Sequence, residues 1–134
     1  MTASALADAQ ASLLALLSQI PGLGAPEAAD FAARWQPRPL LRRGELLVAP
    51  GQVEHTLYFV SRGLLRIFYP TETEEICVGF GYDRTLICSF PSFVSQQPSE
   101  YAVQALRRTE LLGISRPDFL AMVEDNAAFG RFWR

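Results

Sequence analysis

Residues 88–101, CSFPSFVSQQPSEY, form the part of the chain that is richest in uncharged hydrogen-bonding side chains. The segment holds four serines and a pair of glutamines, and its only charged residue is Glu100. It connects two apolar runs that are typical of strands. A segment of this kind either holds a polar ligand through hydroxyl and backbone N–H groups or is a solvated crossover. The candidate binding residues are Arg84, Cys88, Ser89, Phe90, Ser92, Ser99, Glu100 and Tyr101.

Other residue types that carry chemistry are scarce. His55 is the only histidine, so neither a multi-histidine metal centre nor a nucleophile–base–acid triad can be assembled. Cys77 and Cys88 are too few for an iron–sulfur cluster or a disulfide scaffold, and we expect both to be reduced and buried. The sequence therefore predicts no enzyme activity, no metal and no cofactor.

Length and composition favour a single soluble domain. The chain has 134 residues, of which 49% are hydrophobic, and a formal net charge of −2. That size allows a real core, and that charge gives no basic field for nucleic acid. The N-terminus lacks the basic residues of a signal peptide, and no apolar run reaches the roughly 20 residues of a membrane span. We expect a cytoplasmic protein with no membrane contact.

Two helices are predicted before the first strand. Leucines recur at helical spacing over residues 3–20, and the glycines and prolines of residues 21–26 end that pattern. Pro26 suits the first turn of a second short helix that carries Phe31 and Trp35 and stops before Pro37. Residues 1–37 are thus expected to form a helical segment that packs on whatever follows.

From residue 38 the pattern changes to short apolar runs separated by turn residues. The runs are PLLR, ELLVA, LYFVSR, LLRIFY, EICVGF, TLIC, YAVQAL and ELLGI. Short, regularly spaced strands with glycine turns predict an antiparallel sandwich or roll over residues 38–116. Within EICVGF, the side chains of Ile76, Val78 and Phe80 share one face and those of Cys77 and Gly79 share the other. We expect the apolar faces of the strands to close on each other.

The last segment, residues 117–134, is expected to be helical. Ser115 is a good N-cap, because Asp118 follows it at the spacing of a capping box. A second helix is expected to begin near the end of the chain. Phe129, Phe132 and Trp133 would share one of its faces and leave an apolar patch that needs a covering surface.

The ordered pattern of glycines and strands resembles the cyclic-nucleotide-binding β-roll of the Crp/Fnr (catabolite activator) family of bacterial regulators. The stretch GELLVAPGQVEHTLYFVSRGLLRIF carries Gly44, Gly51 and Gly63 where that family turns its strands, and ELLGISRPDFLAMV resembles its last strand and the helix after it. The resemblance implies a mainly β fold with flanking helices. The expected roll is an antiparallel double-stranded β-helix (jelly roll) with N-terminal helices and a C-terminal helix.

The same resemblance places the family's phosphate cassette in residues 88–99. Members that bind cyclic nucleotides have a Gly-Glu pair there and an Arg about ten residues later; the Glu takes the ribose hydroxyl and the Arg pairs with the phosphate. In this sequence the three positions fall at Cys88, Ser89 and Ser99. Arg84, Arg107 and Arg108 flank the segment, but none stands at the phosphate position. We therefore expect cAMP to bind weakly or not at all.

The resemblance implies the effector-sensing domain of a Crp/Fnr-type transcription regulator, with a small-molecule effector of unidentified structure. Two alternatives stay open: a ligand-free scaffold that serves protein interaction, and a true cyclic-nucleotide binder with a non-standard cassette. We expect a homodimer that forms through the C-terminal helix. DNA would be bound only by a helix-turn-helix that this chain does not contain.

Overall fold

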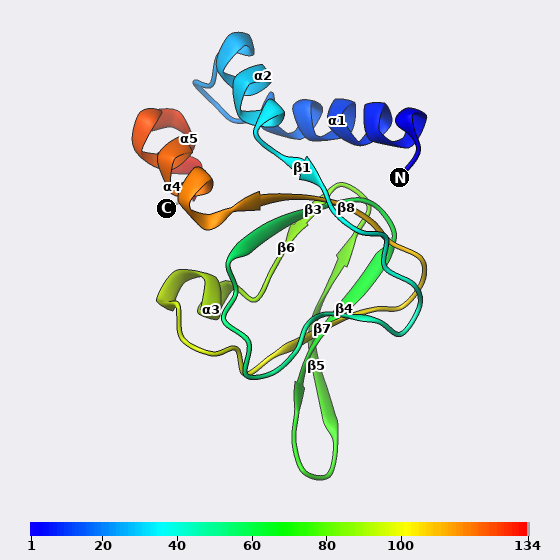
Figure 1. The fold of residues 1–134 in the computed structure, drawn as a ribbon. Coiled ribbons are helices and arrows are strands. Elements are labelled where there is room, and N and C mark those ends of the chain that lie inside the picture. The colour runs from blue at the N-terminus through cyan, green and yellow to red at the C-terminus, as the bar shows by residue number, and fades with distance from the viewer. Residues whose placement is uncertain (134) are drawn as a thin grey trace.

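The computed structural model describes residues 1–133, which fold into two antiparallel sheets flanked by helices (Figure 1). The helices are α1 (Ala3–Leu17), α2 (Ala25–Ala33), α3 (Phe90–Ser95), α4 (Arg116–Asp125) and α5 (Ala127–Trp133). The strands are β1 (Gln36–Pro37), β2 (Leu46–Val48), β3 (Thr56–Arg62), β4 (Leu64–Pro70), β5 (Glu75–Tyr82), β6 (Thr85–Ile87), β7 (Ala102–Ala105) and β8 (Glu110–Ser115).

The strands form two four-stranded sheets with the orders β1-β8-β3-β6 and β2-β7-β4-β5. All pairs are antiparallel. Helices α1 and α2 lie over the first sheet, and the β4–β5 hairpin projects from the opposite end of the molecule (Figure 1). The predicted fold class, an antiparallel β-roll with helices at both ends, is confirmed.

The expected glycine turns are present. Gly44, Gly51 and Gly63 have φ values of 91°, 92° and 141°, in the region that favours glycine. Gly63, between β3 and β4, has a second constraint, because a Cβ there would lie 2.7 Å from the Cα of Thr109. Of the predicted strands, PLLR forms only an isolated bridge between Leu41 and Thr109.

Two apolar clusters hold the fold together. One lies between the helices and the first sheet and includes Leu13, Leu17 and Phe59, and the other fills the roll around Leu65 and Leu111. Helix α1 begins at a Thr2 cap, where the threonine side chain accepts a hydrogen bond of 3.0 Å from the N–H of Ala5. Both N-terminal helices end two or three residues earlier than predicted, although Ile20 and Trp35, which follow them, stay buried.

The prediction of an exposed apolar patch on the last helix is wrong. Ser115 caps α4 as predicted, but Phe129 is only 2% exposed. Trp133 packs with its ring centroid 4.6 Å from that of Phe119. Of the three aromatic residues, only Phe132, which is 50% exposed, faces outward. The turn between α4 and α5 folds the last helix back onto the chain's own core, so that Phe129 and Trp133 pack against it. Arg134, the end of the predicted segment 117–134, lies outside the described residues.

Strand β5 also differs from expectation. Ile76, Val78 and Phe80 are 46%, 55% and 57% exposed, and Cys77 is exposed rather than buried. The reason is that β5 is the edge strand of its sheet, and its first half belongs to the projecting hairpin (Figure 1). A register shift between Ile67 and Phe68 in the β4–β5 pairing also breaks the strict alternation of faces. None of the helices within residues 1–133 is long and apolar enough to cross a bilayer.

Candidate functional site

Helix α3 is the centre of the predicted cassette and connects β6 to β7. Pro91 stands in its first turn, where a missing N–H costs nothing, and Gln96 ends the helix in a left-handed conformation with φ of 59°. The ring of Phe93, which is buried, anchors the helix at a centroid distance of 5.6 Å from Phe119 of α4. The last turn is also held by Arg116, whose Nε donates to the carbonyl of Phe93 at 2.8 Å.

The two serines that the resemblance places at the ribose and phosphate positions, Ser89 and Ser99, are hydrogen-bonded to each other. The Oγ atoms of Ser89 and Ser99 lie 2.7 Å apart, and both residues are buried, at 1% and 5% exposure. Ser99 Oγ also donates to the carbonyl of Tyr101 at 2.9 Å and accepts from the N–H of Tyr101 at 3.0 Å. A hydroxyl group has one proton, so Ser89 must be the donor in the serine pair. The Ser99 hydroxyl is thus fully used within the chain.

A buried acid that sequence reasoning missed lies beside this pair. Glu54 is 5% exposed, and its carboxylate accepts hydrogen bonds of 3.3 Å from the N–H groups of Ser89 and Thr56. Burial raises the pKa of the Glu54 carboxyl, and these two N–H groups together with nearby His55 oppose that rise only in part. The sequence around Glu54 gave no motif that would have singled it out.

The loop that carries Glu54 is tied to α3 by further hydrogen bonds. The N–H of Glu54 donates to Ser92 Oγ at 2.9 Å, and Gln96 Nε2 donates to the Glu54 carbonyl at 2.8 Å. His55, in its predicted exposed position, has Nδ1 at 3.1 Å from Gln96 Oε1. The cassette is therefore a closed polar network whose donors and acceptors largely satisfy one another.

A hollow of about 200 Å³ opens beside this network. It is lined by Pro91, Ser92, Ser95, Gln97, Pro98, Ser99, Glu100 and Tyr101. Its one charged side chain, Glu100, is acidic, and no cation of the described residues lines it. The hollow offers hydroxyl, amide and aromatic surfaces, which suit a neutral or weakly polar molecule better than an anion.

A second hollow of about 410 Å³ lies along the loop before β3 and includes Glu54, His55 and Tyr58 in its lining. Burial, and to a lesser extent the Glu54 carboxylate, raise the pKa of the Tyr58 phenol. No arginine of the described residues lines this hollow either. No group of three or more His, Cys, Asp and Glu residues within positions 1–133 is arranged to hold a metal.

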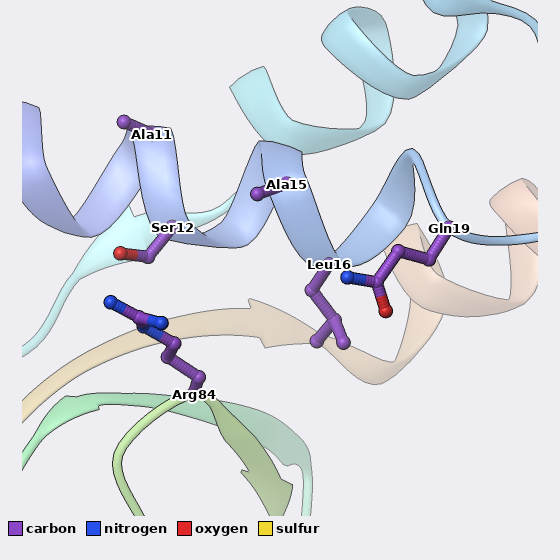
Figure 2. Close-up of a pocket in the computed structure, with 6 residues that line it drawn as sticks. All are labelled: Ala11, Ser12, Ala15, Leu16, Gln19 and Arg84. Atoms are coloured by element: carbon purple, nitrogen blue, oxygen red, sulfur yellow. The ribbon is translucent and has the colours of Figure 1, made fainter.

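The remaining predicted site residues do not line the cassette hollow. Cys88 is buried in the core, and burial raises the pKa of its thiol, with the nearby Glu54 carboxylate adding to the rise. Phe90 packs on Trp133 at a centroid distance of 5.9 Å. Arg84 lies in the turn between β5 and β6 and points toward α1, as Figure 2 shows. The structure thus gathers Ser92, Ser99, Glu100 and Tyr101 around one hollow.

Comparison with solved structures gives the same architecture in several proteins of low sequence identity. The catabolite activator protein of Thermus thermophilus is 23% identical, with a TM-score of 0.73 over 84% of this chain and 52% of that chain. The sensor domain of the transcriptional regulator DNR from Pseudomonas aeruginosa is 17% identical, with a TM-score of 0.74 over 95% of this chain and 81% of that chain. The regulatory domain of Toxoplasma gondii PKA, solved with cAMP, is 21% identical, with a TM-score of 0.76 over 91% of this chain and 47% of that chain.

At these identities the neighbours show the fold alone, and this chain spans about half the length of the Thermus and Toxoplasma chains. No curated protein matches the sequence. The family model for the cyclic nucleotide-binding domain, however, matches residues 39–126, which include every strand of the roll after β1, together with α3 and α4. The chain therefore belongs to the cyclic nucleotide-binding domain family.

Proposed function

We propose that this chain is the effector-sensing domain of a Crp/Fnr-type bacterial transcription regulator, and that it does not bind cyclic nucleotides tightly. The observation that carries the proposal is the buried hydrogen bond of 2.7 Å between Ser89 and Ser99. These serines stand at the positions where the family's nucleotide binders have the ribose-pairing Glu and the phosphate-pairing Arg. Here the two side chains pair with each other.

The lost cation matters most for affinity. A cyclic phosphate is an anion, and its transfer from water to a partly buried site is unfavourable without a positively charged partner. The hollow beside α3 instead contains Glu100, and the buried carboxylate of Glu54 already accepts the Ser89 N–H. A charge-assisted phosphate contact contributes about 2–4 kcal/mol, so its loss weakens binding roughly 30- to 1,000-fold.

The effector in this proposal is a small neutral or weakly polar molecule, recognised by polar groups of the α3 hollow that the cassette network leaves available, such as the Ser95 hydroxyl and the Gln97 side-chain amide. The domain acts in the cytoplasm, without enzyme activity. It dimerises through the C-terminal helix, where Phe132 is the exposed aromatic residue of α5. DNA binding belongs to a helix-turn-helix elsewhere in the regulator. The Pseudomonas sensor domain, named as part of a transcriptional regulator, supports this reading by its similar fold.

The closed cassette favours a second candidate, a ligand-free scaffold that acts through protein contacts. The supporting observation is that the Ser89, Ser92 and Ser99 hydroxyls all have partners within the chain. The two candidates differ in their response to small molecules. A sensor is stabilised against heat by at least one neutral metabolite in a library screen, whereas a scaffold is stabilised by none.

Replacement of both cassette residues tests the proposed loss of nucleotide binding. Ser89→Glu with Ser99→Arg restores the two pairing side chains, and we expect it to raise the affinity for cAMP about 30-fold or more over the unmutated chain. Ser89→Gln with Ser99→Gln is the matched control, because it adds similar bulk without charge. Equal affinity in the two double variants, each verified as folded by its thermal transition, would contradict the assignment of these positions.

A further inference from the structure

The crevice between α1 and the β5–β6 turn has no role in the cassette. It has a volume of about 450 Å³, is open to solvent, and is lined by Ala11, Ser12, Ala15, Leu16, Gln19 and the exposed Arg84. Figure 2 shows five of these residues on or just beyond α1, with the Arg84 side chain extending toward Ser12 from the opposite wall. The volume lies within the range of about 300–1,000 Å³ that is usual for small-molecule sites.

Small side chains on α1 keep the crevice open. The helix packs on the core through Leu13 and Leu17, which are buried, and these residues fix its distance from the first sheet. On the neighbouring face, Ala11, Ser12 and Ala15 leave room that leucine side chains would fill. Positions 12, 15, 16 and 19 follow helical spacing and lie on one side of the helix axis.

The opposite wall presents a cation on a fixed turn. Arg84 has φ of 67°, a conformation that strains residues other than glycine. Its N–H donates to the carbonyl of Val60 at 2.7 Å, and the neighbouring Asp83 carboxylate accepts from the N–H of Gly63 at 2.8 Å. No carboxylate of residues 1–133 lies within 4.0 Å of the Arg84 guanidinium. The turn thus holds a cation at the crevice without an ionic partner.

We propose that this crevice binds a small monocarboxylate with a short apolar chain. The planar guanidinium of Arg84 forms two parallel hydrogen bonds with a carboxylate, and one positive charge balances one negative charge. The Ser12 hydroxyl and the Gln19 amide supply further donors, while Ala11, Ala15 and Leu16 cover the apolar chain. This proposal goes beyond the proposed function, and it stands or falls independently because the crevice shares no residue with the cassette hollow.

The test is a titration with sodium butyrate, followed by the ¹H–¹⁵N resonances of the protein, including the side-chain groups of Arg84 and Gln19. Butyramide, which has the same length and no charge, is the ligand control. Arg84→Gly removes the cation and suits the left-handed turn, so the variant is expected to fold. Arg43→Gly removes an exposed cation that lines none of the hollows described above and serves as the protein control.

We expect butyrate to shift the crevice resonances in a saturable manner with a dissociation constant in the millimolar range. Arg84→Gly and, separately, the crevice-filling Ala15→Leu should each weaken binding about tenfold or more, whereas Arg43→Gly should not. Inorganic phosphate, which carries more charge and no apolar chain, should bind more weakly than butyrate. The proposal is overturned if butyrate causes no saturable shift, if butyramide shifts the same resonances equally, or if Arg84→Gly binds butyrate as the unmutated chain does.

Discussion

Ser99→Ala removes a single hydroxyl group, but it should destabilise the fold strongly because that group takes part in several buried hydrogen bonds. Ser99 Oγ takes part in three hydrogen bonds, at 2.7 Å with Ser89 and at 2.9 and 3.0 Å with the backbone of Tyr101. Ser99→Ala leaves the Ser89 hydroxyl buried without its acceptor, and such a group costs about 1–3 kcal/mol. With the weakened Tyr101 backbone contacts, we expect the free energy of unfolding to fall by about 2–3 kcal/mol.

Urea denaturation of a double-mutant cycle measures this effect. Ser89→Ala combined with Ser99→Ala removes both partners, so its cost should be smaller than the sum of the single variants by about 1 kcal/mol. Ser95→Ala is the matched control, because Ser95 is exposed and accepts one bond of 3.1 Å from the N–H of Gln97. A Ser99→Ala variant within about 0.5 kcal/mol of the unmutated chain, or purely additive single changes, would refute the reasoning.

Three further predictions concern the same framework. Because burial raises the pKa of Glu54 above its ordinary value of 4.5, the folded state holds the proton more tightly than the unfolded state. The free energy of unfolding of the unmutated chain, measured relative to that of a Glu54→Gln variant, should therefore fall as the pH rises above about 4.5. Urea titrations in which this relative stability stays constant or increases with pH would contradict the prediction. Gly63→Ala should lower the free energy of unfolding by more than about 2 kcal/mol, because the added Cβ would overlap the backbone of Thr109. Gly44→Ala, at a positive φ but with open space around the added Cβ, should cost about 1 kcal/mol. Equal decreases in Tm for the two variants would oppose this account. The exposed thiol of Cys77 should react with a thiol reagent in the native protein, whereas Cys88, which is buried and has a raised pKa, should react only on unfolding. A folded Cys77→Ser variant that still reacts with the reagent would disprove this prediction.

The sequence predicted the parts of the fold that local signals determine. Alternation of apolar residues gave the strands, and the glycines at positions 44, 51 and 63 marked turns that the structure has with positive φ. The N-cap at Ser115 was also predictable, since it depends on residues three positions apart. Such features require no knowledge of which elements meet in space.

Features that depend on tertiary contacts could not be predicted. Alternation in β5 predicted a shared face for Ile76, Val78 and Phe80, but it carries no information on the register shift in the β4–β5 pairing or on whether another layer covers the strand. The burial of Phe129 and the packing of the partly buried Trp133 depend on how α5 folds back, which the helical pattern does not determine. Glu54 meets Ser89 across 35 positions of sequence, so its place in the cassette network became visible only in three dimensions.

Isothermal titration calorimetry of the unmutated chain with cAMP and cGMP tests the central claim most directly. The account predicts a dissociation constant in the millimolar range or no measurable heat, because Ser89 and Ser99 pair with each other and no cation lines the α3 hollow within residues 1–133. A micromolar dissociation constant for either nucleotide would contradict the account, since an arginine elsewhere in the chain would then have to carry the phosphate.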